Sequence, residues 1–240
     1  MKAQGLVFLA ADTPRSRAYA QALAARGIEL DRSLLIRSPE RKRWGQADAV
    51  ESGNRDFGDL FAPELGLPLE ESLERLGEVE VSDAGSANDP AIVAWLRDAG
   101  ASLAIYSGFG GQIVRSELLA AGPPLLHLHS GWLPDYRGST TLYYSYLTDG
   151  SCGVTAILLR ESIDTGPIVG RKRYPPPPPG AEVDYCYDSA IRADLLVAVI
   201  EGWVQRGELE RIAQPPGEGR DYYIVHPVLK HVALNRIHAR

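Results

Sequence analysis

A dense run of polar, aromatic and turn-forming residues lies near the middle of this 240-residue chain. It begins with two histidines, His127 and His129, at the end of a short apolar segment of strand length. Alternate residues of a β-strand face the same side, so we expect these two side chains to lie together. Two histidines with no further Cys, His or Glu cluster at ligand spacing are too few for a metal site, and we predict none.

Acid–base catalysis needs only one histidine near neutrality and one carboxylate that orients it. The sequence offers Asp164, in a turn-rich segment between two apolar runs, as that carboxylate. A glycine-rich segment, residues 107–111, follows another apolar run. Its glycines permit either close approach of the backbone to a flat ligand or a tight strand-to-helix turn. The segment contains no GxGxxG pattern, so a dinucleotide site has little support.

Short apolar runs alternate with helical patterns along most of the chain. We expect strands at residues 6–10, 28–36, 101–106, 125–129, 153–160 and 168–174, and helices at 13–26, 90–96, from about 114, 141–147 and 184–206. This alternation predicts an α/β fold with a Rossmann-like, mostly parallel sheet flanked by helices. Ligands bind at the carboxyl ends of such strands, where the two histidines and the glycine-rich segment should meet.

The element pattern divides the chain into one unit, residues 1–206, which carries the candidate catalytic residues, and a short C-terminal extension, residues 207–240. Within the first unit, residues 37–88 are charged and contain several glycines, which indicates a variable insertion or loop-rich region. Its basic cluster, residues 41–44, is either a solvated surface or a contact to an anionic ligand. In the extension we expect short strands or a tail, and the strand-like run 222–225 can pair within the chain or across a homodimer.

Composition narrows the class of partner. Lys and Arg total 25 against 31 Asp and Glu, and the net charge of −6 disfavours broad contact with nucleic-acid phosphates. Two cysteines cannot form a disulfide framework. No apolar run approaches the roughly 20 residues that span a bilayer, and the N-terminus has the pattern of a buried strand rather than of a signal peptide. We therefore expect a cytoplasmic protein with no membrane partner and no nucleic-acid partner.

Two motifs together resemble a known family. They are His-Leu-His-Ser-Gly-Trp-Leu-Pro-Asp-Tyr-Arg-Gly at residues 127–138 and Ile-Asp-Thr-Gly at residues 163–166. This pair is similar to the signature of the folate-dependent formyltransferases, which include glycinamide ribonucleotide formyltransferase, the catalytic domain of methionyl-tRNA formyltransferase and sugar N-formyltransferases. The resemblance is strongest over residues 101–174 and is absent or unclear over 37–88 and the last 60 residues. It implies the formyltransferase fold.

The resemblance implies formyl transfer from 10-formyltetrahydrofolate to an amine through a tetrahedral oxyanion intermediate. His129 would stabilise the oxyanion or polarise the formyl oxygen, and Asp164 would sustain the charged imidazole and help to route the proton. Removing either group should lower the rate by about 10² to 10⁴, the range typical of acid–base and oxyanion groups.

His127 departs from the family pattern, which has asparagine at this position. An asparagine presents a fixed neutral N–H, whereas a histidine can donate an N–H but is bulkier and titrates. Three interpretations follow. His127 replaces the amide as a donor and the enzyme formylates, or it marks altered one-carbon chemistry, or the site is catalytically inactive. The presence of His129 and Asp164 weighs against the last.

The resemblance also implies two binding sets. The folate set is Gly108, Phe109, Gly110, Gln112, Ile113, Val114 and Ile163, and the acceptor set is Ser130, Gly131, Tyr136, Arg137 and Gly138. Tyr136 and Arg137 either touch the acceptor or brace the loop. Four neighbouring aromatic residues are better interpreted as packing: Trp132, Tyr143, Tyr144 and Tyr146.

We expect the acceptor to be a small-molecule amine, such as an amino sugar or the amine of a specialised metabolite. Few residues follow the long helix and the chain is acidic, which disfavours transfer RNA. Two alternatives stay open at this point. One is formyl-folate hydrolysis or other diverted one-carbon chemistry, and the other is a non-catalytic module that binds folate or a nucleotide sugar.

Overall fold

The computed structural model describes residues 1–38 and 56–238, so the basic cluster at 41–44 lies outside the described residues. Its elements follow the predicted alternation of strands and helices: β1 (Leu6–Ala11), α1 (Pro14–Ala25), β2 (Arg32–Ile36), α3 (Leu69–Glu74), β3 (Glu78–Ser82), α4 (Pro90–Asp98), β4 (Leu103–Ser107), α5 (Ser116–Leu119), β5 (Leu125–His129), β6 (Tyr136–Gly138), α6 (Thr141–Asp149), β7 (Cys152–Leu158), β8 (Ile168–Tyr174), a π-helical turn (Val183–Tyr187), α7 (Asp188–Arg206), β9 (Arg220–Tyr222) and α8 (Pro227–His238).

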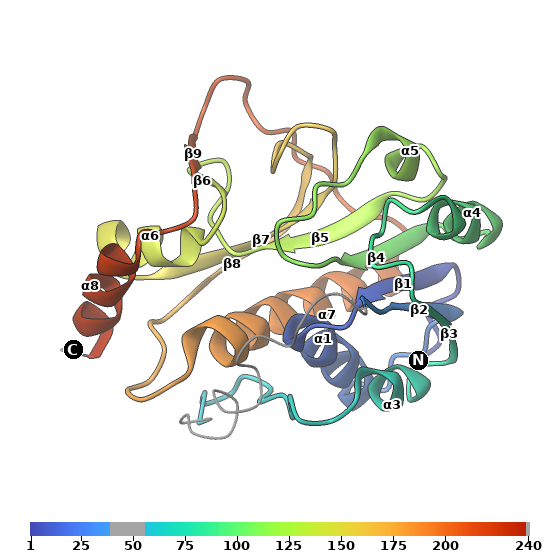
Figure 1. Cartoon of the computed structure of the whole chain (residues 1–240), viewed down its shortest axis with the longest axis horizontal. Helices are drawn as coiled ribbons and strands as arrows, with labels where there is room; N and C mark the ends of the chain where they lie inside the picture. Colours follow the sequence, from blue (N-terminus) through green and yellow to red (C-terminus); the bar gives the residue numbers. More distant parts are fainter. Residues whose placement is uncertain (39–55, 239–240) are drawn as a thin grey trace.

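Seven strands form the main sheet in the order β3-β2-β1-β4-β5-β7-β8 (Figure 1). Strands β1 to β5 pair in parallel, whereas β7 runs antiparallel to β5 and β8 antiparallel to β7. A second sheet consists of β6 and β9. The predicted Rossmann-like, mostly parallel α/β sheet is therefore confirmed.

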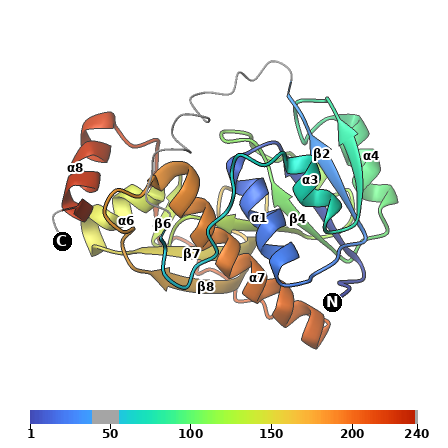
Figure 2. The ribbon, with the colours of Figure 1, turned by 90° about the horizontal axis from the view of Figure 1, so that it is seen from below.

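Strand β1 shows why the central strands appear in the sequence as continuous apolar runs. Leu6, Phe8 and Ala10 pack into the core shared with α1 and α7, and the alternate residues of β1 pack into a second core with α4. Figures 1 and 2 show α1 and α7 on one side of the sheet. A strand buried on both faces has no polar side, which removes the two-residue alternation from its sequence.

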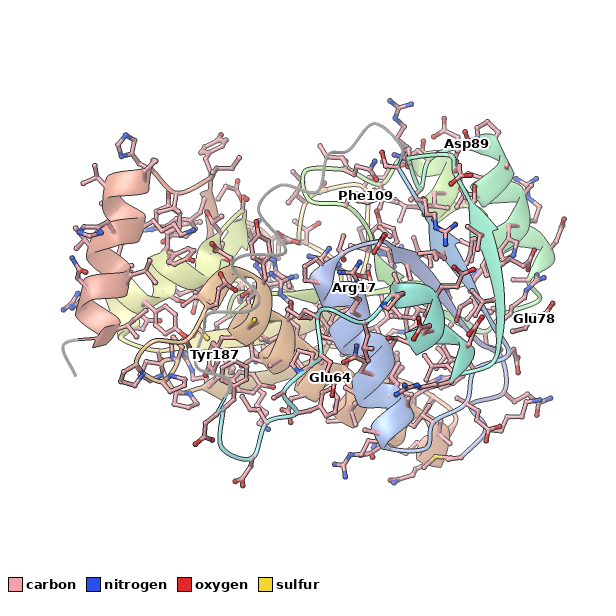
Figure 3. All side chains as sticks on the ribbon, turned by 60° about the horizontal axis from the view of Figure 1, so that its bottom comes forward. Arg17, Glu64, Glu78, Asp89, Phe109 and Tyr187 are labelled. Atoms are coloured by element: carbon pink, nitrogen blue, oxygen red, sulfur yellow. The ribbon has the colours of Figure 1, made fainter. Side chains whose placement is uncertain are left out.

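The region 37–88 contains more regular structure than expected. In its described part, α3 is followed by β3, which is the edge strand of the sheet. The preceding segment is tied to α1, since Arg17 donates to the Leu65 carbonyl at 3.1 Å and Gln21 exchanges hydrogen bonds with the backbone of Glu64. Figure 3 labels Arg17 on α1 and Glu64 on the preceding segment. The sequence did not predict β3 as a strand, because this half-exposed strand contains charged residues and lacks a continuous apolar run.

The C-terminal extension ends in a helix, not in the expected short strands or tail alone. Helix α8 buries Ala233 and Ile237, and Arg236 donates to the Leu147 carbonyl of α6 at 2.6 Å. Strand β9 pairs in parallel with β6 of the same chain, while Tyr223 beside it is exposed. Among the described residues, no helix combines the length and the apolar character that crossing a membrane requires.

Candidate active site

The two histidines of the first motif end β5, and their side chains share one face of the strand. Thr155 on the neighbouring β7 directs the chain that follows them. Its hydroxyl donates to the Gly131 carbonyl at 2.6 Å and accepts from the Leu133 amide at 3.1 Å. The start of the loop is therefore tied to β7 and packs against it through Leu133.

His129 is 4% exposed, and each of its ring nitrogens faces an oxygen acceptor. Nδ1 lies 3.4 Å from Oδ2 of Asp164, and Nε2 lies 2.7 Å from the Tyr136 carbonyl oxygen. Burial lowers the pKa of His129, while Asp164 and the Tyr136 carbonyl oppose that change. A protonated ring satisfies both acceptors and a neutral ring only one. The arrangement is therefore suited to holding and releasing a proton.

Asp164 comes from the loop between β7 and β8 and is held by several distant groups. Its Oδ2 accepts from the Gly138 amide at 2.8 Å. Its backbone has φ of 53°, in the left-handed region. The side-chain amide of Gln214 donates to the carbonyls of Asp164 and Gly166 at 2.8 and 2.7 Å. These contacts fix the carboxylate toward His129.

His127 is half-buried and lies beside Tyr106 of β4, with 6.3 Å between the ring centroids. Its Nδ1 has no hydrogen-bond partner within the described part of the chain. Burial lowers the pKa of His127 well below its usual value, and the positive charges of Arg15 and Arg192 and the neighbouring His129 add to this. His127 is therefore an uncharged imidazole at neutral pH.

The glycine-rich segment runs from β4 toward α5. The Tyr106 hydroxyl occupies the space that a side chain at Gly108 would need, so close packing requires a glycine there. Gln112 donates to the Gly85 carbonyl at 2.9 Å, and its Oε1 is buried without a partner in the described structure. The close packing at Gly108 supports the interpretation as a tight turn. The unused acceptor at Gln112 supports the interpretation as a ligand-binding segment.

The other members of the predicted folate set differ in exposure. Phe109 is buried and Val114 packs against the core beside α4, whereas Ile113 and Ile163 are 61% and 56% exposed. Gly110 is also exposed. Asn88 braces this segment by donating to the Ile113 carbonyl at 2.8 Å. Two apolar side chains are thus presented at the surface near a polar, backbone-rich edge.

The predicted acceptor set lies on the loop after β5. Ser130 donates to Asp188, and Gly138 donates its amide to the Asp164 carboxylate. Tyr136 is 5% exposed and stacks on Tyr222 with 5.4 Å between centroids, which favours a bracing role. Arg137 is half-buried, and its Nε has no partner in the part of the chain that the structure describes. Gly131 contacts Thr155 as described above.

The sequence did not indicate several residues that surround these groups. Arg15 donates to the Gly108 carbonyl at 2.6 Å, and Arg192 donates to the Leu128 carbonyl at 2.8 Å. Gln214 and Asp188 complete this set. A spacing of four on a helix predicts that Asp188 and Arg192 pair, but not that the pair is buried.

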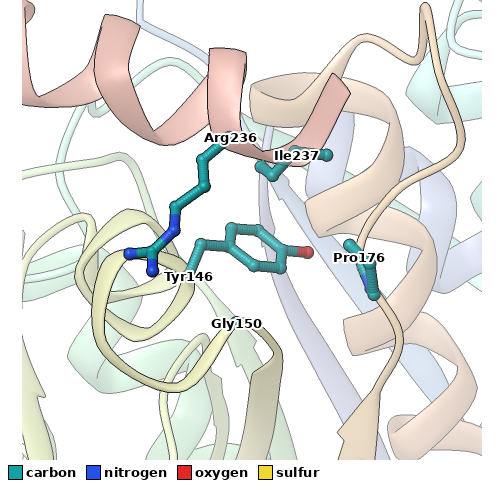
Figure 4. Close-up of a pocket in the computed structure, with 5 residues that line it drawn as sticks. All are labelled: Tyr146, Gly150, Pro176, Arg236 and Ile237. Carbon is teal, nitrogen blue, oxygen red and sulfur yellow. The ribbon is translucent and has the colours of Figure 1, made fainter. Parts of the chain in front are cut away.

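Away from this edge, a hollow of about 10 Å³ lies between α6 and α8 (Figure 4). It is lined by Tyr146, Gly150, Pro176, Arg236 and Ile237. This volume suits about one water molecule, so the hollow offers no room for an organic ligand.

The sequence of this chain resembles those of known proteins. The sequence profile described as formyl transferase matches residues 68–183. Methionyl-tRNA formyltransferase of Roseiflexus castenholzii is 31% identical over 165 residues, covering 67% of this chain and 51% of that protein. The corresponding protein of Chloroflexus aurantiacus is 35% identical over 127 residues, covering 51% of this chain and 40% of its own length. The chain spans about half the length of the curated relatives it matches.

Solved structures agree on the fold. A sugar N-formyltransferase from a Shewanella species superposes with a TM-score of 0.59 at 18% identity, over 97% of this chain and 87% of that one. Phosphoribosylglycinamide formyltransferase from Bacillus halodurans gives 0.56 at 16% identity, over 87% and 97% of the two chains. The profile match includes β5, the loop after it and the Asp164 turn. This chain therefore contains a domain of the formyl transferase family.

Proposed function

We propose that this domain transfers a formyl group from 10-formyltetrahydrofolate to the amine of a small molecule. The observation that carries the proposal is the buried pair of His129 and Asp164, 3.4 Å apart at the carboxyl edge of the sheet. The loop after β4, at the same edge, combines glycines, the unused acceptor of Gln112 and the exposed Ile113, and Ile163 is exposed in the turn that carries Asp164. Such an edge is the usual ligand site of a parallel α/β sheet.

The donor supplies the formyl group, and its N10 leaves as an amine. The residues of this chain would bind the donor and the acceptor and polarise the formyl group. The acceptor nitrogen forms a bond to the formyl carbon, the bond from that carbon to N10 breaks, and one proton passes from the acceptor nitrogen to N10. His129, backed by Asp164, would take and return that proton or face the negative charge that develops on the formyl oxygen, with its Nε2 exchanging the Tyr136 carbonyl for the substrate.

His127 would face the same oxygen as a neutral donor. Its ring nitrogens differ from an asparagine amide in reach and in the ability to titrate, but burial and two nearby guanidinium groups oppose its protonation. A donor that stays neutral over the working range of pH resembles the amide it replaces. We therefore expect His127→Asn to keep or raise formyl transfer, and a complete loss would assign His127 a chemical role of its own.

The donor would bind along residues 108–114 and Ile163. The Gln112 side-chain oxygen is buried without a partner in the described structure, as expected of a group that accepts a hydrogen bond from a ligand. Ile113 and Ile163 offer apolar surface to a flat ring. These features fit a folate, although the same loop would also suit another planar heterocycle.

Two classes of acceptor compete. The net charge of −6 favours a small amine, such as an amino sugar, over a polyanion. The curated relatives carry the name methionyl-tRNA formyltransferase, which favours an aminoacyl-tRNA. Arg137, half-buried and with Nε unpaired in the described structure, is the acceptor-side residue best placed to contact an anionic part of either one.

The test is an absorbance assay of 10-formyltetrahydrofolate with the purified protein, a panel of small amines, and methionyl-tRNA. Donor loss with one small amine, and a formylated product by mass spectrometry, would support the proposal. Formylation of methionyl-tRNA would support the second acceptor class. Donor loss without any acceptor would indicate hydrolysis, and binding without turnover would indicate a non-catalytic folate module.

Variants distinguish a catalytic effect of the pair His129 and Asp164 from a general effect of substitution on the fold. His129→Gln and Asp164→Asn should each lower the rate by about 10² to 10⁴ while donor binding persists. His231→Gln and Asp98→Asn are matched controls, since both residues are exposed and lie on helices away from the edge. Normal turnover in either of the first two variants would refute the assignment of the pair.

A further inference from the structure

The first two turns of α7 reach the end of β5 through two charged residues. Arg192 donates from Nη1 to the carbonyl of Leu128, the residue between the two histidines, at 2.8 Å. Its Nε lies 2.9 Å from Oδ2 of Asp188, one turn earlier. Asp188 in turn accepts a hydrogen bond from the Ser130 hydroxyl. The pair therefore holds the backbone before His129 and the side chain after it.

The sheet leaves this segment without support from one side. The pairing of β4 with β5 ends at Ile105 and Leu126, so β4 offers no partner to Leu128. Beyond that point Arg192 contacts the strand where a neighbouring strand would otherwise do so. This opening lies at the carboxyl ends of the parallel strands, the edge at which α/β sheets bind ligands.

The two side chains are 13% and 16% exposed, which makes their pair largely buried. Burying an ion pair costs desolvation that its attraction scarcely offsets, and well-packed apolar residues of similar volume stabilise a fold as well or better. Stability alone therefore gives no reason for a guanidinium at this position of α7, whereas a fixed donor to Leu128 does.

The charge of Arg192 also acts on both histidines. The charged and titratable groups that face His127 are Arg15 from α1, Arg192 from α7, His129 from β5 and Tyr106 from β4. The nearby carboxylate Asp188 belongs to the surroundings of His129, where it favours the protonated ring while Arg192 disfavours it. The pair thus carries one charge of each sign toward the candidate catalytic strand.

We propose that Arg192 and Asp188 are positioning residues of the candidate site, which hold residues 127–130 in the orientation that formyl transfer needs. This inference rests on the proposed function. Neither residue needs to touch the substrate. Arg192 acts on the strand backbone and on the charge state of His127, and Asp188 anchors Arg192 and Ser130.

Titration of the histidine rings by NMR tests the electrostatic part without any substrate. The chain has five histidines, and His127→Asn and His129→Asn assign the two that matter. Arg192→Met should raise the midpoints of both by about 0.5 to 1 pH unit, Asp188→Asn should lower that of His129, and Arg192→Lys should leave both near wild type. A purely structural role would not produce opposite signs. Midpoints within 0.2 unit of wild type in Arg192→Met and Asp188→Asn would overturn the inference.

Turnover tests the geometric part. A displacement of the reacting groups by about 1 Å can lower a rate 100-fold, so Arg192→Met should lower kcat by about 10- to 100-fold with the KM for the donor within about threefold. Arg192→Lys keeps the charge and should recover part of the loss. Lys172→Met is the matched control. It removes the exposed ion pair between Lys172 of β8 and Asp194, which lies on α7 as Arg192 does.

Unchanged kcat in a folded Arg192→Met protein would overturn the positioning role. If Arg192→Met does not fold, Arg192→Lys and Asp188→Asn decide the same question, and wild-type kcat in both would overturn it. An inactive wild-type protein would refute the proposed function and with it a role of the pair in formyl transfer, whereas the opposite shifts of His129 would still show that the pair sets the charge state of that ring.

Discussion

Replacing Gln214 by alanine isolates a contact that holds the candidate catalytic carboxylate from the C-terminal extension. The side-chain amide of Gln214 donates to the carbonyls of Asp164 and Gly166, at 2.8 and 2.7 Å. Asp164 has φ of 53°, a backbone conformation that a non-glycine residue adopts at some cost. Removing the amide leaves that conformation without its main external support.

The magnitude follows from the number of hydrogen bonds lost. Two neutral hydrogen bonds contribute about 0.5 to 1.5 kcal/mol each, and water can replace part of that at a half-buried site. We therefore expect the local opening free energy of the Asp164 turn to fall by about 2 kcal/mol. Since 1.4 kcal/mol corresponds to a factor of ten, opening should become about 30-fold more frequent.

Hydrogen exchange measures this directly. The Gly138 amide donates to the Asp164 carboxylate at 2.8 Å, so its protection reports whether that carboxylate is held in place. In Gln214→Ala the Gly138 amide should exchange about 30-fold faster, and formyl transfer should fall if it depends on the same geometry. Gln205→Ala, at an exposed position of α7, is the matched control. Gly138 exchange within twofold of wild type in Gln214→Ala would refute the reasoning.

Three further predictions concern stability and reactivity. In Gly166→Ala the new methyl group would clash with the Leu158 carbonyl, and urea denaturation should show a loss of about 1 to 3 kcal/mol; a loss below 0.5 kcal/mol would contradict it. The pKa of His127 is lower in the folded protein than unfolded, so the unfolded state binds more protons below about pH 6.5 and stability should fall there, by at most about 1.4 kcal/mol per pH unit from this group. Urea denaturation at pH 7.5 and 5.5 measures that slope, which His127→Asn should reduce; an equal slope in that variant would argue against it. Burial raises the pKa of the Cys152 thiol to about 12, so iodoacetamide should modify Cys152 at pH 8 only after unfolding, and rapid labelling of the native protein would count against its burial.

The sequence predicted the central elements of the fold closely, because buried strands and their turns leave local signals. The bounds expected for 125–129 and 168–174 are those of β5 and β8. Asp89 caps α4 by accepting from the Ala91 amide at 2.9 Å, and Pro90 opens that helix. These features depend on neighbouring residues alone, so they can be predicted from the local sequence.

The elements that were missed lack such signals. Strand β3 has charged residues on a partly exposed edge, and α8 buries few of its positions, so neither shows a clear apolar period. Both acquire their structure from contacts with distant segments, β3 through β2 and α8 through α6. Tertiary context overrides local propensity for marginal segments of this kind.

The sequence by itself identified three residues with the chemistry for acid–base work, namely His127, His129 and Asp164, and the motif spacing that implies a formyltransferase. Only the tertiary structure decided which groups surround them. Gln214 is 50 residues from Asp164, Arg192 is 64 from Leu128, and Arg15 is 92 from Ser107. No local pattern encodes these contacts, because a polar residue on a helix has the same sequence signal whether it faces solvent or a buried strand end. The packing of α1, α7 and the C-terminal extension onto one sheet edge determines which of these polar residues face a buried strand end.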